Sequence, residues 1–198
     1  MCIKQEFCFM KNERNINYTR PNTRELPPLH LPFYAYSTGE YITAPEDNSN
    51  NQEISNFVEV VWSISGVGEI WLYDRKYEMH SNDVFFYLPG EEHFRKALSP
   101  EWHVRWMCFD GPFAESLMLA YRYPRCQHAA QPYPAETFAA LEKIISSGSS
   151  FAVRECCSLI LHILACAGGY SAEYGQSEKI LDQARFFIAS HLADPTLD

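Results

Sequence analysis

Five side chains in the middle of the sequence are of types that bind small polar molecules: Glu59, Ser63, His93, Arg95 and Trp106. Most of them lie in short stretches of β-branched and aromatic residues, a pattern that predicts strands. Side chains alternate between the two faces of a strand, so Glu59 and Ser63 share one face and His93 and Arg95 share another. A sugar ring can stack on an indole while charged groups bind its hydroxyls. The set therefore predicts a binding site for a sugar or a similar polyhydroxyl ligand.

Each of these side chains also has a purely structural interpretation. His93 can satisfy the polar groups of the turn that precedes it. Glu59 faces solvent if the strand parity is shifted by one residue, and Arg95 can belong to a solvated edge. All four tryptophans can serve in packing: Trp62, Trp71, Trp102 and Trp106. The binding hypothesis depends on the five residues converging in one fold.

Signals for catalysis are weak in this sequence. No G-x-S-x-G motif marks a nucleophile elbow, and the glycine pair in 65–69 has the pattern of a hairpin, without a helix behind it to form a phosphate-binding loop. The adjacent Cys156 and Cys157 fall in a predicted helix, where burial makes thiols inert. We expect no catalytic residue and no cofactor, and we expect that the chain is not an enzyme.

Composition and charge exclude further classes of protein. The 198 residues are 46% hydrophobic and 15% aromatic, which suits one globular domain with an appendage, and the net charge is −9. An acidic surface repels phosphate, so these residues are not expected to bind nucleic acid by themselves. Seven cysteines without a C-x-x-C pair favour reduced thiols, and the pattern of a signal peptide or of a membrane span is not visible. We expect a cytoplasmic protein with no membrane contact.

The hydrophobic pattern changes from strand-like to helical near Gly111. Before it, short apolar stretches recur about every ten residues with turn signals between them, which is typical of a sandwich or barrel. The predicted strands are Phe33–Tyr36 (ending at Gly39), Phe57–Ile64, Glu69–Tyr73, Tyr77–Met79, Val84–Leu88, His93–Arg95 and Trp102–Phe109. The predicted helices are Phe113–Tyr121, Pro134–Ser146, Phe151–Ala167 and a last one that opens at Ser177. Residues 1–30, interrupted by prolines, predict an irregular arm.

Two segments resemble the AraC-type family of bacterial transcription regulators. The first resembles the cupin barrel at the front of these regulators, and its matching pieces are Trp62-Ser63-Ile64-Ser65-Gly66-x-Gly68, Asn82-Asp83-x5-Pro89-x3-His93, Ser99-Pro100-x-Trp102 and Trp106-x2-Phe109-x-Gly111. The second, Lys179-Ile180-Leu181 through Asp194-Pro195-Thr196-Leu197-Asp198, resembles the start of their DNA-binding half. The resemblance implies a regulator truncated where its helix-turn-helix region begins.

The resemblance also implies a fold and a function. The fold is α+β, mainly β: a cupin-type double-stranded β-helix barrel followed by C-terminal helices. The implied division is an arm at 1–30, an effector-binding barrel at 31–111, a helical dimerisation region at 112–170, and at 171–198 a linker and first helix that lead into a missing DNA-binding domain. The implied function is sensing of a small-molecule effector, with a sugar as the favoured class, by a homodimer that contacts DNA only through the absent domain. The alternative is a stand-alone cupin enzyme, such as a sugar isomerase or a metal-dependent oxygenase.

Two of the five site residues match pocket positions of the family's arabinose-binding member. Trp106 matches its sugar-stacking tryptophan, and Arg95 falls at another pocket position. Two further positions depart from that member: Val104 replaces a sugar-contacting residue, and the region of its arginine falls near Ala44-Pro45 here. The resemblance therefore favours a sugar without specifying arabinose.

A cupin resemblance raises the question of a metal ion. Metal-binding cupins use two histidines and a glutamate in one motif and a third histidine in the next, and Glu59 and His93 match the glutamate and the third histidine. The other two histidine positions fall near Gln52 and Ile54, which cannot replace them. Two protein ligands are too few for the usual divalent site, so we expect a metal-free barrel.

The helix predicted at Phe151–Ala167 is apolar nearly all round, so it needs cover on more than one side. One interpretation is a contact with a second subunit around a two-fold axis, which would make the protein a homodimer. The other is that the helix covers its own barrel. The sequence leaves both open.

Overall fold

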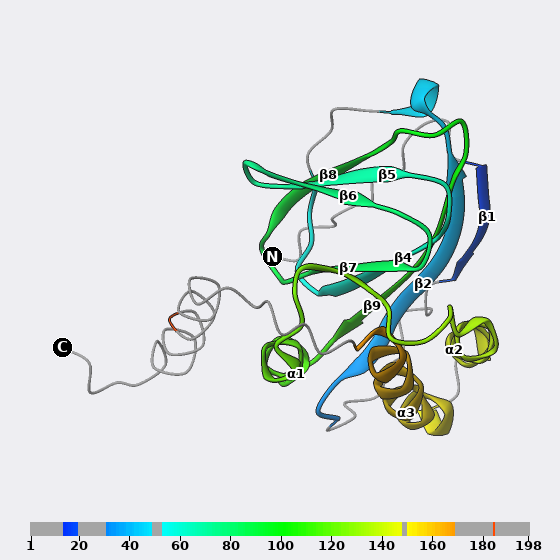
Figure 1. The fold of residues 1–198 in the computed structure, drawn as a ribbon. Coiled ribbons are helices and arrows are strands. Elements are labelled where there is room, and N and C mark those ends of the chain that lie inside the picture. Colours follow the sequence, from blue (N-terminus) through cyan, green and yellow to red (C-terminus); the bar gives the residue numbers. More distant parts are fainter. Residues whose placement is uncertain (1–13, 20–30, 49–52, 148–149, 169–183, 185–198) are drawn as a thin grey trace, which may run out of the picture.

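The computed structural model describes residues 14–19, 31–48, 53–147, 150–168 and residue 184. In this part of the chain, two antiparallel sheets face each other and three helices lie on the outside of the larger sheet (Figure 1). None of the helices described is both long enough and apolar enough to cross a membrane.

The strand order identifies the architecture. The six-stranded sheet has the order β1 (Arg14–Thr19), β2 (Tyr34–Thr43), β9 (Trp102–Asp110), β4 (Val58–Ser65), β7 (Asp83–Tyr87), β10 (Cys126–His128). The four-stranded sheet has the order β3 (Glu53–Ile54), β8 (Glu92–Ala97), β5 (Gly68–Leu72), β6 (Arg75–Met79). The eight strands β2 to β9 thus divide into the orders β2-β9-β4-β7 and β3-β8-β5-β6, which is the double-stranded β-helix. The predicted fold class, α+β and mainly β, is confirmed.

The larger sheet separates two hydrophobic cores. Strand β4 shows why, because every residue from Val58 to Ser63 is buried although side chains alternate between its faces. Val58, Val60 and Trp62 belong to the core under the helices, whereas Val61 belongs to the core between the two sheets. We call the second core the barrel interior. A strand covered on both faces needs apolar residues at both parities, which explains the unbroken apolar runs of this sequence.

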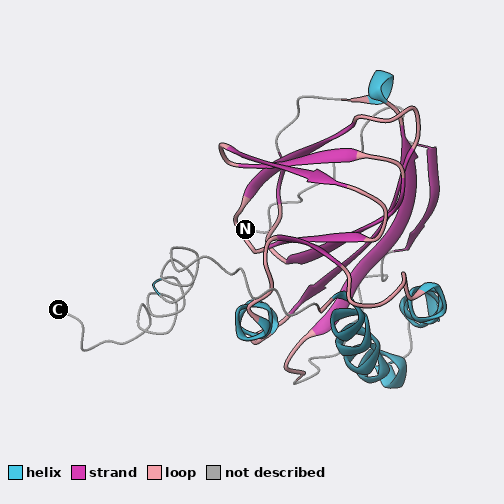
Figure 2. Cartoon of the chain, in the orientation of Figure 1, coloured by secondary structure: helices cyan, strands magenta, loops and turns pink. Residues whose placement is uncertain are grey.

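Three helices cover the outer face of the larger sheet (Figure 2). They are α1 (Ala114–Tyr121), α2 (Ala135–Ser147) and α3 (Ser150–Ala167), close to the predicted bounds. A single 3-10 turn, η1 (Pro45–Asp47), follows β2. Helix α3 buries Cys156, Ile160, Ile163, Leu164 and Ala167 in the core under the helices. Its covering role is therefore observed directly, and Leu161, 38% exposed, lies on its open side.

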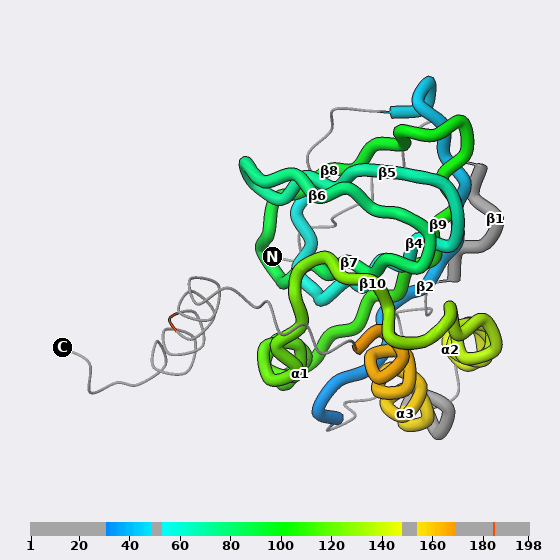
Figure 3. Tube along the Cα trace, viewed as in Figure 1, coloured from blue at the N-terminus to red at the C-terminus, as the bar shows by residue number. Residues whose placement is uncertain are grey.

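Four differences from the predicted elements follow from local sequence. Strand β2 continues through Gly39 to Thr43, and Gly39 pairs with Trp106 on β9. Strand β1 lies within the arm that was predicted to be irregular, and β3 and β10 were not predicted because each has only two or three residues. The chain trace shows β10 running beside β7 (Figure 3). The helix predicted from Ser177 lies outside the described residues apart from residue 184, which is helical.

Candidate functional site

The five residues predicted as a binding set all lie on strands and all turn toward the barrel interior. Glu59 and Ser63 have the parity of Val61 on β4, and Trp106 on β9 is part of the interior core itself. On β8, His93 and Arg95 share the parity of the interior residue Ala97. The expected alternation is therefore what the structure shows.

Arg95 and Glu59 form an ion pair across the barrel interior. The Arg95 Nη1 atom donates a hydrogen bond of 3.0 Å to Glu59 Oε1, and the side chains are 12% and 2% exposed. A second carboxylate, that of Glu53 on β3, lies 3.7 Å from Arg95 Nη2. The guanidinium also lies 5.3 Å from the centre of the Tyr41 ring, within the range of a cation–π contact. Arg95 thus joins the two sheets through charge at a place where water is largely excluded.

His93 is held neutral beside this ion pair. Its Nδ1 atom lies 3.0 Å from the Glu91 carbonyl oxygen, and a carbonyl only accepts, so Nδ1 carries the proton. Burial lowers the pKa of His93 to about 4, and the nearby Arg95 charge acts in the same direction. The Nε2 atom is then an acceptor, and it is buried with no hydrogen-bond partner among the described residues.

Tyr87 lines the same space. Its ring stacks on the His93 ring with the centroids 3.7 Å apart and an angle of 26° between the planes. Its hydroxyl is buried and also has no hydrogen-bond partner in the described part of the chain. Burial raises the pKa of Tyr87 well above its ordinary value, so the hydroxyl keeps its proton and can donate or accept.

Trp106 lies one interior position along the barrel from the level of Glu59, and Ser63 lies two positions from it. Trp106 pairs with Val61, and the next interior residue of β9, Cys108, pairs with Glu59. Ser63 is four residues along β4 from Glu59, about 13 Å at the usual rise of a strand. Its hydroxyl accepts a 3.0 Å hydrogen bond from Trp102 Nε1. The structure therefore brings Glu59, His93 and Arg95 together, with Trp106 one interior position away, and leaves Ser63 at another level of the barrel.

Three residues of this group were absent from the predicted set. Tyr87 pairs directly with Glu59 and shares the parity of the interior residue Phe85, but both faces of β7 are covered, so the sequence does not indicate which face is interior. Tyr41 lay beyond the predicted end of its strand, and Glu53 lay outside every predicted strand. For Glu53 only the tertiary pairing of β3 with β8, which sets it opposite His93, reveals the role.

Comparison with known families decides which family this barrel belongs to. The model of the AraC-like ligand-binding domain matches residues 35–187. The chain belongs to this family. No curated protein matched the sequence.

Solved structures similar to this AraC-like domain are distant. The cupin domain of Cnp3 from Schizosaccharomyces pombe has 13% identity and a TM-score of 0.35 over 49% of this chain and 66% of that one. The EutQ protein of Clostridium difficile has 14% identity and a TM-score of 0.33 over 40% and 59%. An RmlC-like cupin protein of Methanocaldococcus jannaschii has 10% identity and a TM-score of 0.35 over 43% and 76%. The chain thus spans 66% of the length of the Cnp3 domain and 59% of the length of EutQ.

The residues of this AraC-like domain do not fit a cupin metal site. Glu59, the expected carboxylate ligand, is already paired with the Arg95 cation, which would repel a metal ion. Ile54, near an expected histidine position, is 50% exposed, and Gln52 lies outside the described residues. Within the described ranges no group of three His, Cys, Asp or Glu side chains has a metal-binding arrangement.

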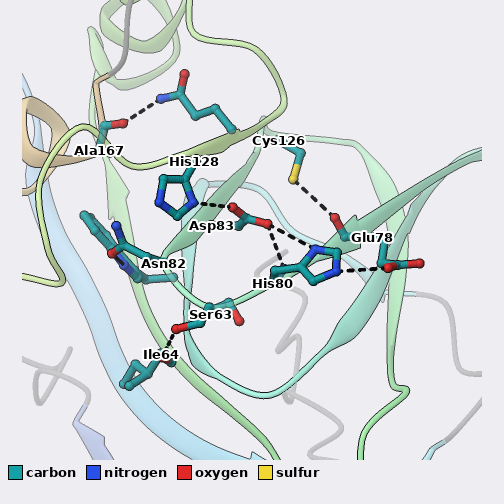
Figure 4. A network of polar contacts seen from close by, with 12 residues as sticks. Ser63, Ile64, Glu78, His80, Asn82, Asp83, Cys126, His128 and Ala167 are labelled. Carbon is teal, nitrogen blue, oxygen red and sulfur yellow. Dashed lines mark hydrogen bonds and ion pairs between the residues drawn. The ribbon is translucent and has the colours of Figure 1, made fainter.

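A second polar network lies at the edge of the barrel and anchors the helices (Figure 4). Asp83, at the start of β7, lies between two histidines, with His128 Nδ1 at 3.0 Å and His80 Nδ1 at 3.7 Å. The neighbouring Gln127 donates a 2.8 Å hydrogen bond to the Ala167 carbonyl at the end of α3. Because His80 and His128 are 60% and 69% exposed, we assign this network a structural role that ties β7 and β10 to α3.

A third network joins the larger sheet to α2. Arg105 on β9 donates to Glu40 on β2 at 3.0 Å and to Glu142 on α2 at 2.8 Å. Its guanidinium lies 5.4 Å from the centre of the Phe138 ring. Arg105 is 2% exposed, so this charge cluster fixes the position of α2 on the barrel.

Proposed function

We propose that this AraC-like domain is the effector-sensing part of a transcription regulator and carries out no reaction. The effector is a small polar molecule, with a sugar as the favoured class, and it binds in the barrel interior. The observation that carries the proposal is the grouping of an ion pair, Arg95 with Glu59, and two buried polar atoms that have no hydrogen-bond partner among the described residues, His93 Nε2 and the Tyr87 hydroxyl.

Such a grouping is costly in a protein that binds nothing. A buried polar atom left without a hydrogen bond destabilises the fold by about 1–3 kcal/mol. A ligand with several hydroxyls supplies partners to both atoms and to the charged pair, and the Trp106 indole offers a face for its ring. Glu59, His93, Arg95 and Trp106 therefore form the proposed contact set. Ser63, hydrogen-bonded to Trp102, is not included in the direct contacts.

The partners proposed for the domain follow from the family. We propose an arm at 1–30, the barrel at 31–111, a dimerisation region at 112–170 and a linker at 171–198 that leads to a DNA-binding domain. Dimerisation is assigned to the helical region because the outer side of α3 exposes Leu161 beside polar residues. The described cysteines are all free thiols, which suits the reducing cytoplasm, where we place the protein.

Isothermal titration calorimetry with a panel of aldopentoses and aldohexoses tests the proposal. The wild-type chain should bind at least one sugar, and Trp106→Phe and Trp106→Ala should weaken that binding by about tenfold or more, since a sugar stacked on indole loses part of its contact. Trp71→Phe, on the outer face of the smaller sheet, is the matched control and should leave the affinity unchanged. Two results would overturn the site: no binding by any sugar, or equal affinity in folded Trp106→Phe and wild type.

A further inference from the structure

The barrel interior contains two acceptors that face each other, and within the described part of the chain no donor lies between them. His93 Nε2 lies 3.9 Å from Glu53 Oε2. This separation is too long for a hydrogen bond, and neither atom can donate, because the His93 proton is on Nδ1 and the carboxylate has none. The Glu53 side chain is 26% exposed and His93 is 1% exposed, so the pair lies where the interior meets solvent.

The distance between these acceptors suits a single donor atom that carries two protons. A nitrogen about 2.8 Å from each of two atoms that are 3.9 Å apart makes two good hydrogen bonds. It needs two N–H bonds to do so. A hydroxyl has a single proton and can satisfy only one of the two acceptors, whereas a primary amine or ammonium can satisfy both.

The charges of the barrel interior favour the same group. Glu53 and Glu59 oppose a single guanidinium, that of Arg95, while His93 is neutral. The other buried carboxylate on this side of the fold, Glu91, already has its own cation, since Arg125 binds it through two hydrogen bonds of 2.8 Å. One carboxylate is therefore left without a matching cation among the described residues around Arg95. An anionic ligand would increase this imbalance, and a cationic one would remove it.

We propose that the effector carries a primary amino group, which donates to His93 Nε2 and to the Glu53 carboxylate. The inference rests on the proposed function and narrows it from polyhydroxyl ligands to amino sugars or similar hydroxylated amines. Glu53 is then the residue that selects the charge of the ligand, while Glu59 and Arg95 bind its hydroxyls.

Calorimetry on the full chain with matched sugars tests this inference. The probes are glucose, galactose and mannose, their 2-amino and N-acetylated 2-amino forms, and the corresponding uronic acids. At least one amino sugar should bind about tenfold or more tightly than its neutral parent, and the N-acetyl and uronic acid forms should bind no better than the parent. Glu53→Gln should reduce the preference for the amine, measured as the ratio of its affinity to that of the neutral parent in the same variant, to below about threefold.

Glu92→Gln is the matched control, because Glu92 belongs to β8 beside His93 but has the opposite parity. It should leave the preference unchanged. A neutral sugar or a uronic acid that binds as tightly as its amine, or a preference that survives in Glu53→Gln, overturns the amino-group inference and leaves the sugar site in place. If no probe of any class binds, the proposed function falls, and this inference falls with it.

Discussion

Replacement of Arg95 by methionine would leave the Glu59 carboxylate buried without a cation. Glu59 is 2% exposed and lies 3.0 Å from Arg95 Nη1, so it has little access to water when the guanidinium is removed. Loss of one partner from such a pair costs about 3–5 kcal/mol. Loss of the contact with the Tyr41 ring adds about 0.5–1 kcal/mol, and the partly exposed Glu53 adds little. We expect Arg95→Met to lower the free energy of unfolding by about 4–5 kcal/mol.

Urea denaturation followed by tryptophan fluorescence measures this loss. The double variant Glu59→Met/Arg95→Met should recover most of the stability, because apolar side chains of similar volume replace a buried pair at little cost. Lys96→Met is the control. Lys96 follows Arg95 on β8 and lies partly exposed on the opposite face, so its replacement should lower the free energy of unfolding by less than about 1 kcal/mol. A loss below about 1 kcal/mol in Arg95→Met, or a double variant no more stable than the single one, would refute the account of a buried pair.

Three further outcomes follow from the contacts described. Burial lowers the pKa of His93 from 6.5 to about 4, so between these pH values the unfolded chain binds more protons than the folded one. The stability that depends on neutral His93 is fully present above about pH 6.5 and is lost as the pH falls toward 4. Urea titrations at several pH values should show this pH dependence, up to about 3 kcal/mol, in the wild type and not in His93→Gln. Arg125→Gln leaves the Glu91 carboxylate, 6% exposed, without its bidentate partner and should lower the unfolding free energy by about 3 kcal/mol, whereas retention of wild-type stability would contradict the buried pairing. Gly68→Ala places a Cβ inside the Trp102 ring and should lower the free energy of unfolding by about 2 kcal/mol or more. At Gly90 a Cβ meets no other atom, but φ is +82°, so Gly90→Ala should lower it by only about 1 kcal/mol. Calorimetric melting of the two variants checks this order.

The strands were predictable where turn residues bounded an apolar run. The stretch Val84–Leu88 begins after a turn and ends before a proline, and β7 covers nearly the same residues. The inward side of such a strand was harder to predict, because both faces of the larger sheet are covered and alternation carries no signal there. Tyr87 was therefore not separated from its apolar neighbours, although it contacts His93.

The candidate site was predictable in its residue types and strand parities, and not in its contacts. His93 and Arg95 could be placed on one face of β8 by counting, as the structure has them. The hydrogen bond between Arg95 and Glu59 depends on how the two sheets face each other. Local sequence does not encode this arrangement. Ser63 has the interior parity but lies at another level of the barrel from Glu59, and only the packing of Trp102 shows that its hydroxyl already accepts a hydrogen bond. Long-range pairing decided each of these outcomes.

We propose that a ligand in the barrel interior binds the buried acceptor of His93. Long-range ¹H–¹⁵N NMR of the histidine side chains, recorded with and without saturating glucosamine and with glucose for comparison, tests it most directly. The account predicts a neutral Nδ1–H form of His93 in the free protein and a shift of its Nε2 resonance toward a hydrogen-bonded acceptor when the sugar binds, with the exposed His80 unchanged. A His93 Nε2 resonance that does not move while calorimetry shows saturation would contradict it.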